Sequence, residues 1–247
     1  MRAWSRLFTP YLERHGAAPY TEQDYFAYVD GKPRYDGVRS LLQARGIAIP
    51  EGTPDDDPAL DTVCGLGNRK NAEFTAELHE HGVSPYPGSL RFLTAAIDAG
   101  YEVAVVSSSA NAKQVLTTAG IIDRFDVIVD GAVARADGLA GKPAPDTYLD
   151  AATRFGLTAA QCVVVEDATS GVEAGRNGAF GLVVGVDRGA GADSLREHGA
   201  DVVVTDLADL LPDLATAVPG AGAPDADQSD ADQSHADPSH ADTGKTA

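Results

Sequence analysis

The sequence is short of positive charge, and it has few residues of several other informative kinds. It holds 19 Lys and Arg against 37 Asp and Glu, for a net charge of −18. Such a surface repels phosphate backbones and anionic lipid headgroups, so we expect neither nucleic-acid nor membrane binding. Cys64 and Cys162 are too few for a disulfide framework and are expected to be buried and reduced. No apolar run could span a bilayer and no signal peptide is visible, so the expected location is cytoplasmic.

The end of the sequence differs in composition from the rest. A five-residue unit repeats as DADQS, DADQS, HADPS and HADTG, with no aromatic or large aliphatic side chain. Such a segment cannot bury enough apolar surface to offset its ordering entropy. We therefore expect residues 215–247 to form a disordered acidic tail. His235 and His240 could bind a metal loosely, but a solvated tail is the favoured interpretation.

Residues 1–84 have the pattern of a helical domain. Apolar side chains recur at helical spacing between Trp4 and Leu12. Thr21, followed three residues later by Asp24, resembles a helix start. Further helices are expected after Pro33 and in the stretch that ends before Gly82. No good strand is visible in this part.

Residues 85–214 alternate between short valine-rich runs and helical patterns. The expected strands are 103–108, 125–130, 162–167, 180–186 and 200–206, and the expected helices are 89–99, 111–119, 146–155, 169–177 and 205–211. Continuous Val and Ile runs between helices are typical of a parallel sheet covered on both faces. The sequence therefore predicts a doubly wound α/β domain, with ligands at the carboxyl ends of its strands.

Three polar groups follow expected strands. Ser107 begins a Ser-Ser-Ser-Ala-Asn segment, Lys142 lies in a loop framed by two prolines, and Glu166-Asp167 ends the run CVVVED. Helix capping explains the serines and Asp167 equally well in isolation, and a loop lysine is usually just solvated. Two adjacent carboxylates at a buried strand end, however, favour a hard cation such as Mg²⁺.

Together these groups suit magnesium-dependent phosphoryl transfer. A cation and a lysine would neutralise phosphoryl oxygens, and a hydroxyl would position them. None of the six histidines falls in these motifs, and no Ser-His-Asp arrangement suggests itself.

The order VVSSS, GKPAPD and VVVEDATSGVEAG resembles the haloacid dehalogenase superfamily over nearly the whole chain except the tail. The resemblance implies a Rossmann-like sheet with residues 1–84 as a helical cap domain. It makes Ser107 and Lys142 catalytic, and Glu166 and Asp167 ligands of Mg²⁺.

Within that superfamily the chain looks most like the β-phosphoglucomutase group. The segment DGKPRYDGVRSLL resembles the cap segment that grips a phosphate, which implies that Arg34 holds the non-reacting phosphate. Ser109 and Asn111 match the partners of that phosphate in the α/β domain. Ala110 departs from the group, which often has a basic residue there, and this weakens the mutase assignment.

A larger departure is the absence of the Asp-x-Asp-Gly strand whose first Asp attacks phosphorus and whose second acts as acid and base. In the family that strand lies between the strands carrying Ser107 and Glu166. Without it, two facing rows of backbone groups would lack partners, at about 1–3 kcal/mol for each buried group. Another segment could fill the gap, or the chain could fold poorly. The favoured expectation is a true start upstream of Met1.

Three functions remain open at this level. The leading one is a sugar-phosphate mutase, which by resemblance would interconvert β-glucose 1-phosphate and glucose 6-phosphate. A phosphatase for small phosphate esters is the alternative that Ala110 leaves room for. If the printed chain is complete, it could only bind a phosphorylated sugar or a protein. The particular sugar and the oligomeric state are not predicted.

Overall fold

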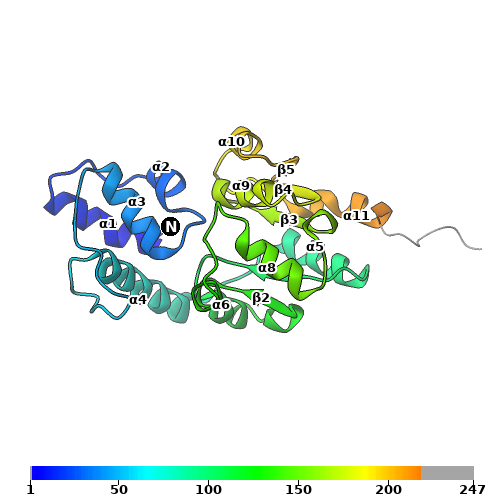
Figure 1. The fold of residues 1–247 in the computed structure, drawn as a ribbon, viewed down its shortest axis with the longest axis horizontal. Coiled ribbons are helices and arrows are strands. Elements are labelled where there is room, and N and C mark those ends of the chain that lie inside the picture. Colours follow the sequence, from blue (N-terminus) through cyan, green and yellow to red (C-terminus); the bar gives the residue numbers. More distant parts are fainter. Residues whose placement is uncertain (1, 218–247) are drawn as a thin grey trace, which may run out of the picture.

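The computed structural model describes residues 2–217, which form a helical domain beside an α/β domain (Figure 1). The expected disordered tail is outside the described residues, apart from the last helical residues 215–217. The helical domain, called the cap below, contains the following elements: α1 Arg2–Arg14, α2 Glu22–Asp24, the π-helical turn η1 Tyr25–Val29, α3 Arg34–Ala44 and α4 Val63–His81. Between residues 2 and 84 the structure has no strand, as predicted.

The cap is held together by its own apolar core. The inward face of α1 contributes Phe8, Tyr11 and Leu12, each fully buried. These side chains pack with buried leucines of α3 and α4, and burial of one such side chain stabilises the fold by about 1.5–3 kcal/mol. The predicted start at Thr21 is confirmed, because Thr21 and Asp24 form a reciprocal capping box.

The α/β domain, called the core below, consists of short parallel strands with helices between them. Its strands are β1 Ala104–Val106, β2 Val127–Val129, β3 Val163–Glu166, β4 Leu182–Val186 and β5 Val202–Val204. Its helices are α5 Pro87–Asp98, α6 Ala112–Thr118, α7 Gly131–Ala136, α8 Asp146–Arg154, α9 Thr169–Asn177, α10 Ala192–Glu197 and α11 Leu211–Ala217, with 3₁₀ turns η2 Ile122–Arg124, η3 Ala159–Gln161 and η4 Leu207–Leu210. The predicted α/β class is confirmed.

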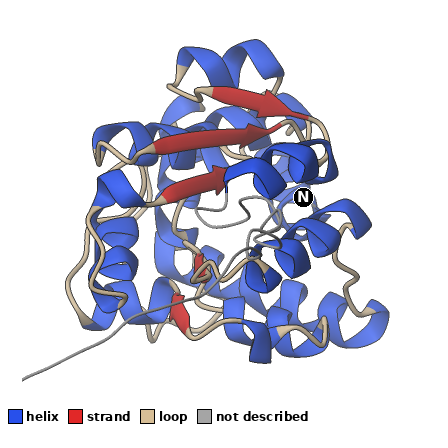
Figure 2. Cartoon of the chain, turned by 90° about the vertical axis from the view of Figure 1, so that its right-hand side faces the viewer, coloured by secondary structure: helices blue, strands red, loops and turns tan. Residues whose placement is uncertain are grey.

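The parallel strands lie in two sheets instead of one. β1 pairs with β2, while β3, β4 and β5 form a separate sheet, and the two groups lie apart in Figure 2. β1 and β3, the strands predicted to flank a gap, are thus both edge strands within residues 2–217. Val163 and Val165 of β3 remain 54% and 39% exposed, so the expected cover on both faces is incomplete there.

Several local predictions need correction. Helices α7 and α10 were not predicted, because each has only six residues and shows no clear apolar period. The helix expected at 205–211 is a 3₁₀ turn followed by α11. Both cysteines are free, but Cys162 is only half-buried. Among the described helices, none is long and apolar enough to cross a membrane.

Candidate active site

A cavity of about 550 Å³ lies between the cap and the core. All seven residues singled out in the sequence line it: Arg34, Ser107, Ser109, Asn111, Lys142, Glu166 and Asp167. Parallel strands explain this convergence, since β1 and β3 end at the same side of the core. The volume is in the range typical of small-molecule sites.

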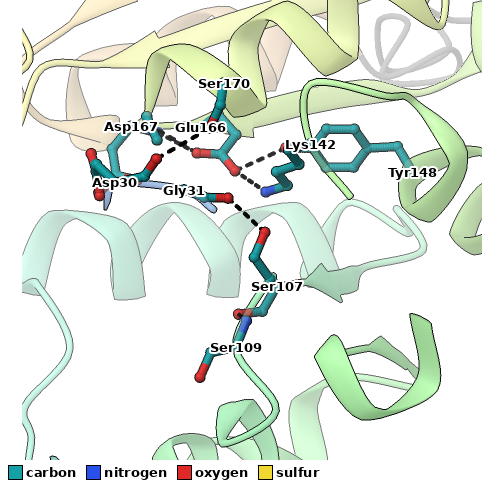
Figure 3. Close-up of polar contacts among 11 residues, drawn as sticks. Asp30, Gly31, Ser107, Ser109, Lys142, Tyr148, Glu166, Asp167 and Ser170 are labelled. Atoms are coloured by element: carbon teal, nitrogen blue, oxygen red, sulfur yellow. Dashed lines mark hydrogen bonds and ion pairs between the residues drawn. The ribbon is translucent and has the colours of Figure 1, made fainter. Parts of the chain in front are cut away.

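Glu166, which lines this cavity, is the centre of a polar network with Lys142 and Tyr148 (Figure 3). Its Oε1 accepts hydrogen bonds from the ammonium of Lys142 and from the hydroxyl of Tyr148, the latter at 2.9 Å. Its Oε2 accepts the backbone N–H groups of Asp167 at 2.9 Å and Ala168 at 3.1 Å. Each carboxylate oxygen therefore has two donors, which fixes both the carboxylate and Lys142.

Burial and charge act in opposite directions on Glu166. Burial alone would raise the pKa of the Glu166 carboxyl, but the Lys142 ammonium and the hydrogen bonds hold that pKa below its usual value. Burial and the same carboxylate raise the pKa of Tyr148 well above its usual value. Lys142 itself is only 7% exposed, so the pair is shielded from solvent screening.

Asp167 faces a more negative environment than Glu166. Burial, then the negative charges of Glu166 and Asp30, raise the pKa of Asp167 to about 6. Asp30 comes from the cap, and burial raises the pKa of its carboxyl as well. These carboxyls lie close enough to repel one another, so a cation beside Asp167 would relieve an unfavourable arrangement.

The cap supplies positive charge to the cavity lining through Arg34 and Lys70. Arg34 begins α3 and is half-buried, with its guanidinium 5.5 Å from the centre of the Tyr35 ring. Lys70 of α4 contacts the rings of Trp4 and Phe74. Within the described chain neither cation forms an ion pair. Burial and the nearby Arg34 charge lower the pKa of Lys70 to about 8.

The cap closes directly on the core through the loop at Asp30 and Gly31. The Ser108 hydroxyl donates to the Gly31 carbonyl at 2.6 Å, and the Ser170 hydroxyl donates to the Asp30 carbonyl at 3.3 Å (Figure 3). Gly31 has φ of +70°, and a Cβ there would clash with Ser170. The loop therefore needs glycine both for its conformation and for its close approach.

A second contact between the domains involves two asparagines. The Asn111 side chain donates to the Asn71 side chain of α4 at 2.6 Å. Ser109 lies beside it, and its hydroxyl accepts the backbone N–H of Asn111 at 3.1 Å. Ser107 has the same role one step earlier, since its hydroxyl accepts the Ser109 N–H at 3.1 Å. These two hydrogen bonds thus hold the serine loop in the conformation in which it lines the cavity.

Sequence reasoning missed several lining residues: Asp30, Lys70, Asn71 and Arg135. Lys70 and Asn71 lie within a continuous helix, where a polar residue usually faces solvent. Their position in the cavity depends on how α4 packs against α1 and α3, which no local pattern specifies. Tyr148 was missed because a tyrosine in an amphipathic helix normally indicates core packing.

No group of three or more His, Cys, Asp or Glu side chains within residues 2–217 is arranged to hold a metal ion. The chemistry of the site nevertheless fits Mg²⁺, which binds through one or two carboxylates and completes its shell with water and substrate phosphate oxygens. Asp167 is the carboxylate whose side chain is available for this, since it is exposed to the cavity. Lys142, the serine loop and such a cation could together neutralise and orient a phosphoryl group.

Comparisons with known proteins show which family the chain resembles. A family model described as haloacid dehalogenase-like hydrolase matches residues 11–178. The β-phosphoglucomutase of Mycobacterium bovis is 52% identical over 221 residues, which cover 85% of this chain and 84% of the relative. Hexitol phosphatase A of Escherichia coli is 30% identical over 83% of this chain and 82% of the relative.

The fold has the same relatives among solved structures. The β-phosphoglucomutase of Clostridium difficile matches with a TM-score of 0.67 at 21% identity, covering 85% of this chain and 84% of the other. A hydrolase from Pseudomonas syringae matches with a TM-score of 0.69 at 22% identity, over 88% and 92%. The family model and the 52% identity confirm the resemblance seen in the motifs. The chain belongs to the haloacid dehalogenase-like hydrolase family.

Proposed function

We propose that this protein is a β-phosphoglucomutase, which interconverts β-glucose 1-phosphate and glucose 6-phosphate. The observation that carries the proposal is one cavity lined by two groups of side chains suited to phosphate. Lys142 and Ser107 would hold the reacting phosphate, and Arg34 with Ser109 and Asn111 would hold the other one; all five residues line this cavity. A mutase needs both groups, because a bisphosphate must exchange its two phosphates between them. The 52% identity to the mycobacterial mutase supports the same assignment.

The described cavity residues would bind and orient a phosphate, and none of them is a recognised nucleophile. No Asp-x-Asp-Gly segment occurs in the printed sequence. Lys142, fixed by Glu166 and Tyr148, would hold the reacting phosphate, and Ser107 would hydrogen-bond to it. The contacts of Ser108 and Ser170 with the cap loop would keep the cavity closed and exclude water during transfer.

Mg²⁺ is the cofactor we propose, with Asp167 as its direct protein ligand. When bound, the cation supplies positive charge to the phosphoryl oxygens. Glu166 is predicted as a second ligand, but its oxygens already accept four hydrogen bonds. Its direct binding to a cation would require loss of one of these. A small phosphorylated sugar remains the proposed partner, and the cytoplasmic location stays a prediction.

A product assay tests the proposed function. The protein is incubated with β-glucose 1-phosphate, Mg²⁺ and a trace of glucose 1,6-bisphosphate, and glucose 6-phosphate and inorganic phosphate are measured in parallel. We expect glucose 6-phosphate without free phosphate. Release of phosphate without glucose 6-phosphate would instead establish a phosphatase, and binding without either product would establish a non-catalytic protein. Both of these results would overturn the mutase proposal.

Tyr148→Phe is expected to weaken Mg²⁺ binding by about tenfold. The substitution removes the hydroxyl that donates to Glu166 Oε1 at 2.9 Å and leaves the ring in place. Glu166 and Lys142 would then be held less firmly beside Asp167. Calorimetric titration of Mg²⁺ in the presence of glucose 6-phosphate measures the change.

Tyr101→Phe is the matched control, since Tyr101 is 39% exposed and lies outside the cavity lining. Its Mg²⁺ affinity should equal that of the unchanged protein. If Tyr148→Phe lowers only the unfolding temperature and leaves Mg²⁺ affinity intact, the hydroxyl serves stability alone.

Sugar-phosphate affinity is expected to fall as the pH rises through about 8. Burial and the Arg34 charge lower the pKa of Lys70 to about 8, so the free protein loses this positive charge there. A bound phosphate dianion favours the charged amine, so binding takes up a proton above that pH. Dissociation constants for glucose 6-phosphate between pH 6.5 and 9.5 measure the effect. Lys70→Met should remove this pH dependence; an unchanged profile in the variant would contradict the assignment.

A further inference from the structure

Arg135 is a cavity-lining cation that neither the motifs nor the proposed function has used. It lies on α7, one helical turn after Gly131, and it belongs to the core, whereas Arg34 and Lys70 belong to the cap. Its side chain is exposed and forms no ion pair with any described residue. Asp137, two residues further along the chain, pairs with Arg154 at 3.1 Å. Arg135 is therefore a free positive charge at the cavity.

The position of α7 is fixed by contacts with the serine loop. Asp130 caps the helix by accepting the N–H groups of Ala132 and Val133, both at 2.9 Å. The Gly131 N–H donates to the Ser109 carbonyl at 3.2 Å. A Cβ at Gly131 would lie 2.5 Å from the Ser108 carbonyl oxygen, so only glycine permits this approach. The helix that carries Arg135 is thus anchored to the loop that lines the cavity.

Arg135 and Arg34 line the same cavity, Arg135 from the core and Arg34 from the cap. The pKa of Arg34 is lowered first by burial, and the positive charge of Arg135 contributes to the lowering. Two guanidinium groups that repel each other, neither in an ion pair with a described residue, form an arrangement that an anion would stabilise. The serine loop, Ser107 to Asn111, carries no cation of its own. Arg135 is consequently the cation that the core offers beside this loop.

We propose that Arg135 binds the non-reacting phosphate from the core side, so that this phosphate lies between Arg135 and Arg34. The proposal rests on the proposed function and identifies a further specificity residue of the same site. A phosphate ester carries about −1.5 to −2 charges near neutral pH, which matches two guanidinium groups. The planar fork of each arginine can donate two hydrogen bonds to phosphate oxygens. The shared phosphate would also link the domains. A ligand with two phosphates could occupy this position and the position beside Lys142 at the same time, so it should bind better than a ligand with one.

Equilibrium binding tests this without depending on turnover. Dissociation constants for glucose 1,6-bisphosphate and for glucose 6-phosphate are measured by calorimetry in Mg²⁺ at low and moderate salt. Arg135→Gln should weaken bisphosphate binding by about tenfold or more and should reduce its salt dependence. Arg135→Lys keeps the charge but not the fork, and should recover part of the loss.

The control is Arg196→Gln, an exposed arginine that pairs with Asp193 at 3.0 Å and lies outside the cavity lining. Its affinity for both ligands should be unchanged, and unfolding temperatures should match for all variants. If the unchanged protein binds the bisphosphate and Arg135→Gln binds it within twofold, the Arg135 proposal is wrong while the proposed function stands. If the unchanged protein binds neither sugar phosphate, the proposed function fails, and the Arg135 proposal fails with it.

Discussion

Replacing Lys142 with methionine is expected to lower the free energy of unfolding by about 3–5 kcal/mol. The substitution keeps most of the side-chain volume but removes the ammonium that donates to Glu166. Glu166 would remain as a buried carboxylate without its cation, which costs more than the lost contact alone. Since domains are stable by about 5–15 kcal/mol, the loss is a large part of the total. Urea unfolding at pH 7 measures it.

A double-mutant cycle separates the charge pair from the general cost of substitution. Glu166→Gln alone leaves a buried ammonium, whereas the double variant Lys142→Met with Glu166→Gln leaves no charge. We expect the double variant to be more stable than the sum of the single losses predicts. Additive losses would show that the two side chains do not stabilise each other, contrary to the buried network in the structure.

The same pair predicts how stability depends on pH. The Lys142 ammonium holds the pKa of Glu166 below its usual value in the fold, although burial acts to raise it. The unfolded chain therefore binds a proton at higher pH than the folded chain. The stabilisation is present above the ordinary glutamate pKa of about 4.3 and is lost as the pH falls through the lower folded value. Lys142→Met should remove this acid-side loss.

Arg34→Ala is expected to reduce mutase turnover by about 100-fold while leaving the fold intact. Arg34 has no ion pair among the described residues, so its removal leaves no carboxylate unpaired. What is lost is the charge-assisted, two-pronged contact with the phosphate that is not transferred. Arg34→Lys should recover only part of the activity, because it keeps the charge without the fork. The measurement is kcat/KM for β-glucose 1-phosphate.

The control for Arg34 is Arg91→Ala, since Arg91 is exposed on α5 and lies outside the cavity lining. Its kinetics should be unchanged. The sugar-phosphate mutase proposal fails if Arg34→Ala turns over β-glucose 1-phosphate at the normal rate. If the variant instead gains phosphate release as it loses glucose 6-phosphate, Arg34 is confirmed as the group that keeps the intermediate bound.

The sequence predicted well those features that depend on local pattern. The five strands were placed by valine-rich runs, and the capping box at Thr21 was visible from two residues alone. The convergence of Ser107, Lys142 and Asp167 on one cavity followed from a general rule about parallel strands. The gap between β1 and β3 was predicted from the resemblance, through the absence of one motif.

Features that depend on how the cap meets the core could not be predicted. The Gly31 carbonyl contacts Ser108, 77 positions away, and nothing in either local segment indicates this. Arg135 lies on a six-residue helix with no apolar period, so no local pattern indicated the helix or the position of its charge. The Tyr148 hydroxyl on α8 reaches Glu166 at the end of β3, 18 positions away, and no local pattern indicates this contact. These contacts are long-range products of tertiary packing.

The central claim is that one cavity holds both phosphates of a sugar bisphosphate between cap and core. A crystal structure of the protein with Mg²⁺ and glucose 1,6-bisphosphate tests it most directly. We predict one phosphate beside Lys142 and Ser107, and the other between Arg34 and the loop of Ser109 and Asn111. A bisphosphate with either phosphate bound outside these two positions, or with the sugar outside the cavity, would contradict the account.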